Sequence, residues 1–255
     1  WFDQLTMNDV GLVGGKNASL GEMISHLSQA GVKIPTGFAT TTKAYREFLT
    51  INGLTSRINQ LLRELDVDDI NALTVAGQTI RNWILNATLP DTFLNAIKQA
   101  YEQLVATDSN QDKISFAVRS SATAEDLADA SFAGQQETLL NVCGFEQIIA
   151  AIKIVFASLY NDRAIAYRAH HKFSHDKVYL SAGIQRMVRS DLGASGVMFT
   201  LDTESGFRDV IFITSAYGLG ETIVQGVVNP DEFYVYKRGL TTGNYALLSK
   251  RLGTK

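Results

Sequence analysis

The feature of the sequence that most constrains its fold is a change in hydrophobic period near residue 115. Upstream of this point, apolar residues recur every three to four positions, a spacing typical of amphipathic helices. The predicted helices cover about residues 20–27, 43–51, 56–65, 69–85 and 91–105. Downstream of residue 178, short runs of β-branched and aromatic residues are separated by turn residues. The predicted strands cover about residues 179–187, 196–201, 210–214 and 232–236.

The middle of the chain joins these two regions. Phe116-Ala117-Val118 predicts a buried strand, the small and acidic residues of 120–134 predict a loop, and 145–170 predicts one long helix. Helices followed by strands favour an α+β fold. We expect a helix-rich lobe over residues 1–175 and a strand-rich second lobe, incomplete at its C-terminal end, over residues 176–255.

The composition is that of a globular protein, with 45% hydrophobic and 19% charged residues. A net charge of -3 without a basic stripe offers no electrostatic basis for binding nucleic acid or an anionic membrane. No apolar run reaches the roughly 18 residues that a bilayer crossing needs. The single cysteine, Cys143, can form no internal disulfide, which indicates a cytoplasmic protein. Its apolar neighbours predict that Cys143 is buried.

An anion-binding motif is predicted at Gly14-Gly15-Lys16. The two glycines allow close backbone approach, Lys16 adds a positive charge, and a capping box at Ser19 and Glu22 predicts a helix that begins just afterwards. The spacing is not that of a Walker A loop, because Val10 occupies the place of its first glycine. An ordinary glycine turn with a solvated lysine fits the same residues.

A second phosphate-binding residue is predicted at the end of the buried strand. Arg119 can project from the strand end into a cleft, where its planar guanidinium would bind phosphate oxygens in pairs. An ion pair with Glu125 or Asp126 is the alternative. Farther along, Gly134 permits close backbone contact and Thr138 supplies a hydroxyl, a combination that fits either a mobile lid or a plain surface loop.

Two further segments offer nucleotide contacts. The strand end at Gln185, Met187 and Val188 can bind an adenine edge through its backbone while Met187 packs on the ring, although an ordinary edge strand fits equally well. After Gly218 and Gly220, Glu221 can meet a ribose or a metal, or cap the next helix.

The four histidines do not predict a metal site. His170 and His171 fit the end of a helix, where partial positive charge is favoured, and no cysteine or carboxylate pattern accompanies them. We therefore predict no metal ligands among the residues of this chain.

These motifs occur together, in one order, over essentially the whole chain. Residues 8–23, 116–138, 181–190 and 229–234 resemble the N-terminal ATP-binding domain of the phosphoenolpyruvate synthases, or pyruvate, water dikinases, of the PEP-utilising enzyme family. Residues 124–132 are similar to the synthases and differ from the Gly- and Met-rich loop of the pyruvate phosphate dikinases.

The resemblance implies an ATP-grasp-like, two-lobed domain that binds ATP with Mg²⁺. It also implies transfer of a diphosphate unit from ATP to a histidine on a swivelling domain, release of phosphate by water, and phosphoryl transfer to pyruvate in a separate barrel domain. The implied nucleotide contacts are Lys16, Arg119, Gly134, Thr138, Gln185, Met187, Val188 and Glu221, with Lys16 and Arg119 also in catalytic roles.

The chain is expected to be a fragment. The closing strands with the metal ligands, the phosphohistidine domain and the pyruvate barrel are expected beyond Lys255, so the chain alone should not form phosphoenolpyruvate. Two other functions stay open at this point: the ATP-binding domain of a rifampicin-type antibiotic phosphotransferase, and a nucleotide-binding module without chemistry.

Overall fold

The computed structural model describes residues 1–106, 114–123, 126–127, 130–131 and 137–254. It contains two compact units, Trp1–Met187 and Val188–Lys255. The sequence placed a lobe boundary at 175/176, whereas the units divide after Met187. The difference arises because strand β6 (Leu180–Arg186) is hydrogen-bonded between two strands of the first unit.

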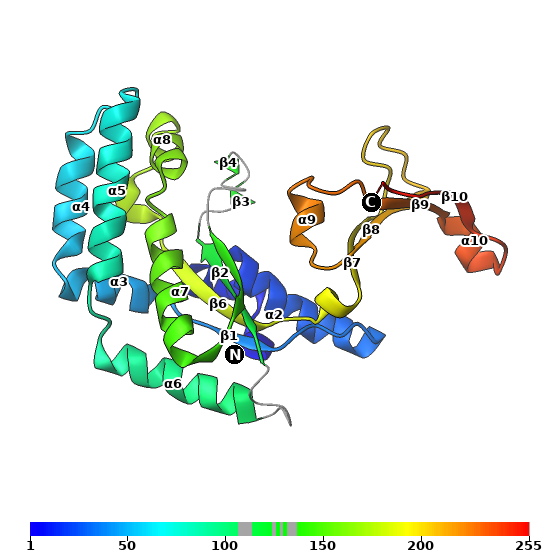
Figure 1. Ribbon diagram of the computed structural model, residues 1–255, viewed down its shortest axis with the longest axis horizontal. Helices are drawn as coiled ribbons and strands as arrows, with labels where there is room; N and C mark the ends of the chain where they lie inside the picture. Colours follow the sequence, from blue (N-terminus) through cyan, green and yellow to red (C-terminus); the bar gives the residue numbers. More distant parts are fainter. Residues whose placement is uncertain (107–113, 124–125, 128–129, 132–136, 255) are drawn as a thin grey trace. The chain divides into compact units, whose positions relative to one another are not determined.

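The first unit combines helices with one main sheet (Figure 1). Its helices are α1 (Val10–Val13), α2 (Gly15–Leu27), α3 (Thr42–Ile51), α4 (Leu54–Arg63), α5 (Ile70–Asn86), α6 (Asp91–Ala106), α7 (Gly144–Ser158) and α8 (Asp162–His170). Its strands are β1 (Gly37–Ala39), β2 (Phe116–Ala122), β3 (Asp126–Leu127), β4 (Ala130–Ser131), β5 (Thr138–Val142) and β6.

The main sheet has the order β1-β6-β2-β5, with every neighbouring pair antiparallel. Helix α7 packs on one face of the sheet and α2 contacts β2 from the other (Figure 1). Because successive strand residues point to opposite faces, β2 and β6 are buried on both sides.

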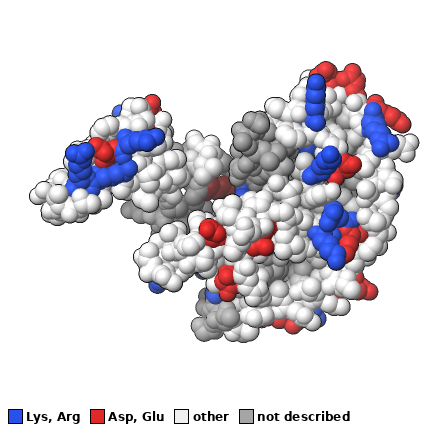
Figure 2. Space-filling view, turned by 180° about the vertical axis from the view of Figure 1, so that it is seen from behind, with Lys and Arg blue, Asp and Glu red and all other residues white. Residues whose placement is uncertain are grey.

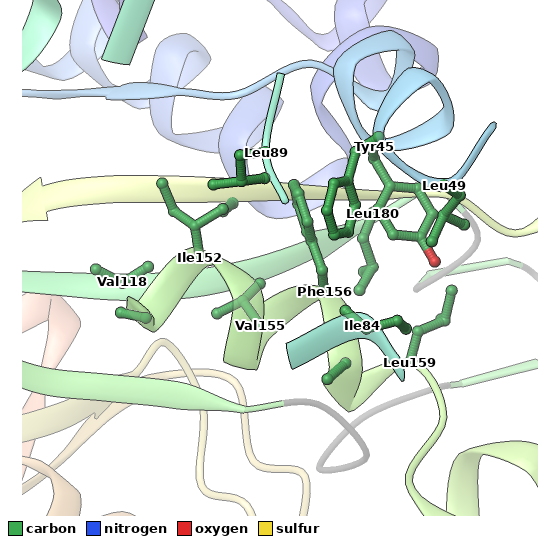
Figure 3. Close-up of a cluster of buried hydrophobic side chains, with 14 of the residues drawn as sticks. Tyr45, Leu49, Ile84, Leu89, Val118, Ile152, Val155, Phe156, Leu159 and Leu180 are labelled. Atoms are coloured by element: carbon green, nitrogen blue, oxygen red, sulfur yellow. The ribbon is translucent and has the colours of Figure 1, made fainter. Parts of the chain in front are cut away.

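The hydrophobic core lies on the α7 face. Figure 3 shows Val118 of β2 and Leu180 of β6 beside Ile152 and Phe156 of α7. The Phe156 ring meets the ring of Tyr45, from α3, edge to face at a centroid distance of 4.9 Å. Helices α3, α4, α5 and α6, which the sequence predicted, supply the outer wall of this core.

Local hydrogen bonds explain where the helices start. The hydroxyl of Thr41 accepts a hydrogen bond from the backbone N–H of Ala44 and caps α3, and a carboxylate oxygen of Asp69 caps α5 in the same way. Helix α2 differs from the prediction, because it begins at Gly15 and places Ser19 inside the helix. The expected capping box at Ser19 was therefore wrong.

The region predicted as one long helix is two helices. Arg81 of α5 donates hydrogen bonds to the carbonyl oxygen of Tyr160 (2.7 Å) and to the carboxylate of Asp162 (2.8 Å). These bonds hold the break between α7 and α8, where Asn161 is extended. The predicted loop over 120–134 was also partly wrong, because β2 continues to Ala122 and β3 pairs with β4.

The second unit is built on an antiparallel sheet with the order β10-β9-β8-β7. Its elements are β7 (Ala194–Phe199), β8 (Val210–Tyr217), α9 (Glu221–Val224), β9 (Asp231–Tyr236), α10 (Lys237–Thr242) and β10 (Leu247–Arg251). The rings of Phe199, Phe212 and Tyr234 stack across neighbouring strands on this sheet. The last helix and strand were not predicted.

The structure confirms the α+β class, with two four-stranded antiparallel sheets and the β3-β4 pair among the described residues. Within the described ranges, no helix is both long and apolar enough to cross a membrane. On the face shown in Figure 2, the larger groups of Lys and Arg side chains adjoin Asp or Glu side chains.

Candidate functional site

The candidate anion-binding segment packs directly against strand β2. Gly14 has φ +77° and ψ 165°, a conformation that is accessible essentially only to glycine. A Cβ atom at Gly14 would lie 2.4 Å from both the backbone oxygen and the hydroxyl of Ser121. The glycine therefore permits the start of α2 to touch the strand.

Asn17 stabilises the contact between α2 and the main sheet through hydrogen bonds. Its side chain is 2% exposed, and its Nδ2 donates to the carbonyl oxygen of Val13 and to the hydroxyl of Ser181, each at 3.0 Å. Its backbone N–H donates to the hydroxyl of Ser121 at 3.1 Å. A Cβ atom at Gly183 would lie 2.2 Å from Asn17 Oδ1, so the bare backbone of β6 makes room for this amide.

These contacts define the face of the main sheet on which Arg119 lies. Ser121 contacts α2, and Arg119 precedes it by two residues on the same strand, so both side chains point to the α2 face. Thr138 of β5 is paired with Arg119, and Gly183 of β6 is paired with Arg119 on the other side. Residues directly opposite each other share a face, which places Thr138 beside Arg119.

The structure thus brings three predicted site residues to one side of the main sheet. Lys16 lies in the first turn of α2, between Gly15 and the anchored Asn17, and is half-buried. Arg119 is also half-buried, whereas Thr138 is exposed. Two cationic side chains and a hydroxyl near a helix N-terminus form an arrangement suited to phosphate groups.

The predicted adenine segment has a different environment. Gln185 is 8% exposed, and its Nε2 donates to the carbonyl oxygen of Pro35 at 3.1 Å. Strand β6 is central and not an edge strand. The backbone N–H of Met187 donates to the oxygen of Ser115 at 2.9 Å, and Val188 is exposed at the start of the second unit.

The remaining candidates lie in the second unit or outside the described residues. Glu221 begins the short helix α9 in the second unit, where its carboxylate accepts a hydrogen bond from Gln225 Nε2 at 3.0 Å. Gly134 lies outside the described residues. Glu125 and the side chain of Asp126, the alternative partners of Arg119, also lie outside them.

The structure adds residues that sequence reasoning missed. Asn17 was passed over, although a polar residue on a helix face next to Ala18 and Leu20 is a recognisable signal. Lys172 and Lys177 line a cavity of about 610 Å³ at the end of β2. Two lysines five residues apart in a polar turn would have marked this cavity as cationic.

The predictions for cysteine and histidine have mixed outcomes. Cys143 is exposed just before α7, so the prediction that it is buried was wrong. His170 ends α8, as the helix pattern indicated. The described part of the chain contains no group of three or more His, Cys, Asp or Glu residues placed to hold a metal ion.

Comparison with known proteins gives one consistent result. The pyruvate phosphate dikinase AMP/ATP-binding domain family matches residues 10–255. The whole chain is 61% identical to the phosphoenolpyruvate synthase of Pseudomonas aeruginosa (strain UCBPP-PA14) and 59% identical to that of Escherichia coli (strain K12). A probable phosphoenolpyruvate synthase of Staphylothermus marinus is 43% identical over 94% of the chain, and the match spans 28% of that protein's length.

The chain spans 32% of the length of the Pseudomonas and Escherichia proteins. The match nevertheless extends through both compact units and includes Lys16, Arg119 and Glu221. The chain therefore belongs to the pyruvate phosphate dikinase AMP/ATP-binding domain family.

Proposed function

We propose that this chain is the ATP-binding part of a phosphoenolpyruvate synthase, which converts pyruvate, ATP and water into phosphoenolpyruvate, AMP and phosphate. The observation that carries the proposal is identity of about 60% over the full chain to proteins with that name. The alternative of an antibiotic phosphotransferase is not favoured, because the similar proteins are named as synthases. Those names equally disfavour a nucleotide-binding module without chemistry.

In this proposal the α2 face of the main sheet binds the phosphates of ATP. Arg119 and Lys16 would neutralise their charge, and Thr138 would donate its hydroxyl to a phosphate oxygen. The anchored Asn17 and the close contact at Gly14 support this assignment, because a phosphate site needs its backbone held in place before the ligand arrives. Gly134 is assigned to the same phosphate-covering segment by the family resemblance.

The adenine would lie against the segment that includes Gln185, Met187 and Val188, and contacts would come from backbone groups. Because the side-chain amide of Gln185 is already bonded to Pro35, it is not the group assigned to the base. Glu221 would contact the nucleotide from the second unit. The two units then correspond to the two lobes of an ATP-grasp-like domain.

Mg²⁺ is proposed to accompany ATP, because it offsets charge on the phosphoryl group during transfer. The acceptor in the proposal is a histidine on a swivelling domain of the whole protein, and a barrel domain would bind pyruvate. The chain spans 32% of the length of the Pseudomonas relative, which leaves room for both domains in the whole protein.

The test is calorimetric titration of the chain with MgATP, beside Lys16→Ala and Arg119→Ala. Each substitution removes a hydrogen bond between charged groups, worth about 1.5–3 kcal/mol, and should weaken binding about tenfold to a hundredfold. Lys43→Ala is the matched control, since Lys43 forms an exposed pair with Glu47 at 3.7 Å on α3.

The melting temperature distinguishes a binding role from a structural one. Both site variants should melt within about 2 °C of the wild type, because neither side chain is fully buried. Unchanged MgATP affinity in both variants would refute the phosphate assignment. A large loss of stability in Arg119→Ala would instead make Arg119 a structural residue.

A further inference from the structure

Arg168 is a buried cation with no ion-pair partner among the described residues, and its guanidinium lies 5.7 Å from the centre of the Tyr160 ring. It lies on α8 with 0% of its surface exposed. Its Nε donates to His175 Nδ1 at 2.9 Å, and its Nη2 donates to the carbonyl oxygen of Leu159 at 2.6 Å. Its Nη1 has no hydrogen-bond partner in the part of the chain that the structure describes. Burial of an unbalanced charge is costly, so this cluster has a deficit of negative charge.

The groups around Arg168 are also donors. Because Nδ1 of His175 accepts from Arg168, its ring proton lies on Nε2, which is then a donor. Burial and the nearby Arg168 charge lower the pKa of His175 from 6.5 to about 4, so the ring is neutral at pH 7. Burial raises the pKa of Tyr45 and of Tyr160, so both phenols keep their protons.

The hydrogen bond between the two phenols uses the proton of Tyr45 and leaves that of Tyr160 without an acceptor in this pair. The Tyr45 hydroxyl donates to the Tyr160 hydroxyl at 3.5 Å, so the proton of Tyr160 needs an acceptor elsewhere. Together with Arg168 Nη1 and His175 Nε2, the cluster presents three donors. Of the three, Arg168 Nη1 is the donor that is buried and unpaired within the described residues, and donors gathered beside a cation favour an acceptor with negative charge.

A cavity adjoins these donors. It has a volume of about 140 Å³, and Tyr45, Tyr160 and His175 form part of its wall. Leu49, Ile58 and Val178 supply apolar wall. This size fits a few heavy atoms and their hydration, and the mixed wall fits a molecule with one polar and one apolar end.

The charged groups at the cavity support an anion. Arg46 lines it and holds its guanidinium 4.9 Å from the centre of the Tyr179 ring. Asp176 is the acidic residue in the lining; it is exposed, and its carboxylate already accepts a hydrogen bond from the Ser174 hydroxyl. Two arginines, Arg46 in the wall and Arg168 bonded to His175 of the wall, therefore outnumber the carboxylate of Asp176.

We propose that this cavity is a binding site for a short-chain monocarboxylate. The carboxylate would accept from Tyr160 and His175 while Arg168 balances its charge, and the aliphatic end would lie against Leu49 and Ile58. The site is separate from the proposed phosphate site. Tyr45 packs in the core on the α7 face of the main sheet, whereas Arg119 lies on the α2 face.

Acetate titration followed by two-dimensional NMR of the ¹⁵N-labelled chain tests this proposal. We expect saturable shifts of the amide signals of Tyr45, Tyr160 and His175, and no saturable shifts with acetamide, which has the same shape without the charge. Tyr160→Phe should weaken acetate binding about tenfold or more, because it removes one hydrogen bond to a charged group. Tyr217→Phe, which alters an 83% exposed phenol, should leave binding unchanged.

Arg168→Met should abolish acetate binding. If Arg168→Met does not fold, the Tyr160→Phe comparison alone decides the question. Shifts that do not saturate, equal responses to acetate and acetamide, or wild-type affinity in Tyr160→Phe would each overturn the proposal. Inorganic phosphate that saturates the same signals while acetate does not would overturn the carboxylate assignment.

Discussion

Replacement of Gly14 by alanine tests whether the start of α2 must touch β2. The added Cβ would lie 2.4 Å from the backbone oxygen of Ser121, far inside van der Waals contact. Alanine would also have to adopt the positive φ of 77° with ψ 165°, at a cost of about 1–3 kcal/mol. Relief of the clash by movement of α2 adds about 1–3 kcal/mol. We therefore expect a total loss of about 2–6 kcal/mol of unfolding free energy.

Gly53→Ala is the matched control. Gly53 also has a positive φ, 65°, but a Cβ there meets nothing within 4 Å. Gly53→Ala should therefore lower the free energy of unfolding only through backbone strain, by about 1–2 kcal/mol. The difference between the two variants then reports on the contact between Gly14 and Ser121 together with the more restrictive backbone conformation of Gly14, whose ψ is 165° against 15° at Gly53.

Tryptophan fluorescence during urea unfolding is a suitable assay, because Trp1 and Trp83 both lie in the first unit and report on it alone. Gly14→Ala should also weaken MgATP binding, since Lys16 follows in the displaced turn, whereas Gly53→Ala should not. Equal stability losses in the two variants would refute the argument that close packing requires Gly14.

Two further predictions concern buried polar groups. Asn17→Ala removes two hydrogen bonds donated by Nδ2 and should lower the free energy of unfolding, measured in urea, by about 1–3 kcal/mol. The control Asn86→Ala removes one exposed hydrogen bond to Asn82 and should lower it by less than about 0.5 kcal/mol. Similar losses in the two variants would contradict the anchoring role of Asn17. The folded-state pKa of His175 is lowered to about 4, so the unfolded chain binds more protons between about pH 4 and 6.5. Stability from this group is therefore complete above pH 6.5 and falls as the pH drops toward 4. His175→Gln should lose less stability than the wild type between pH 7 and pH 5, measured by urea midpoints, and an equal loss would contradict this account.

The sequence was informative where local rules dominate. Helical spacing predicted α3 and α5 close to their observed bounds, because their caps and apolar faces are contained within the segments. It failed at the start of α2, where the Ser19 capping pattern was a local possibility that the packing of Gly14 overrides. It also failed at Tyr160, because the hydrogen bond from Arg81 comes from a distant helix.

The candidate site shows the same division. Lys16 and Arg119 could be selected from the sequence, since glycines before a cation and an arginine after a buried apolar run are chemical signals within short segments. The expected position of Arg119 at a strand end was wrong, because β2 continues to Ala122 and Arg119 lies in its middle. The placement of Lys16 and Arg119 relative to the main sheet could not be predicted from the sequence. It depends on the pairing of Arg119 with Thr138 and Gly183, and on the hydrogen bonds from Asn17 to Ser121 and Ser181.

The sequence by itself determined the succession of a helix-rich and a strand-rich region, the α+β class and the family resemblance, because each is carried by residue type and spacing along the chain. Only the tertiary structure decided that β6 belongs to the first unit and that Arg119 lies on the α2 face. Only it placed Tyr160 and His175 in the wall of one cavity, with Arg168 bonded to the His175 ring. The physical reason is that strand register and the closure of buried polar clusters are set by contacts between segments far apart in the chain.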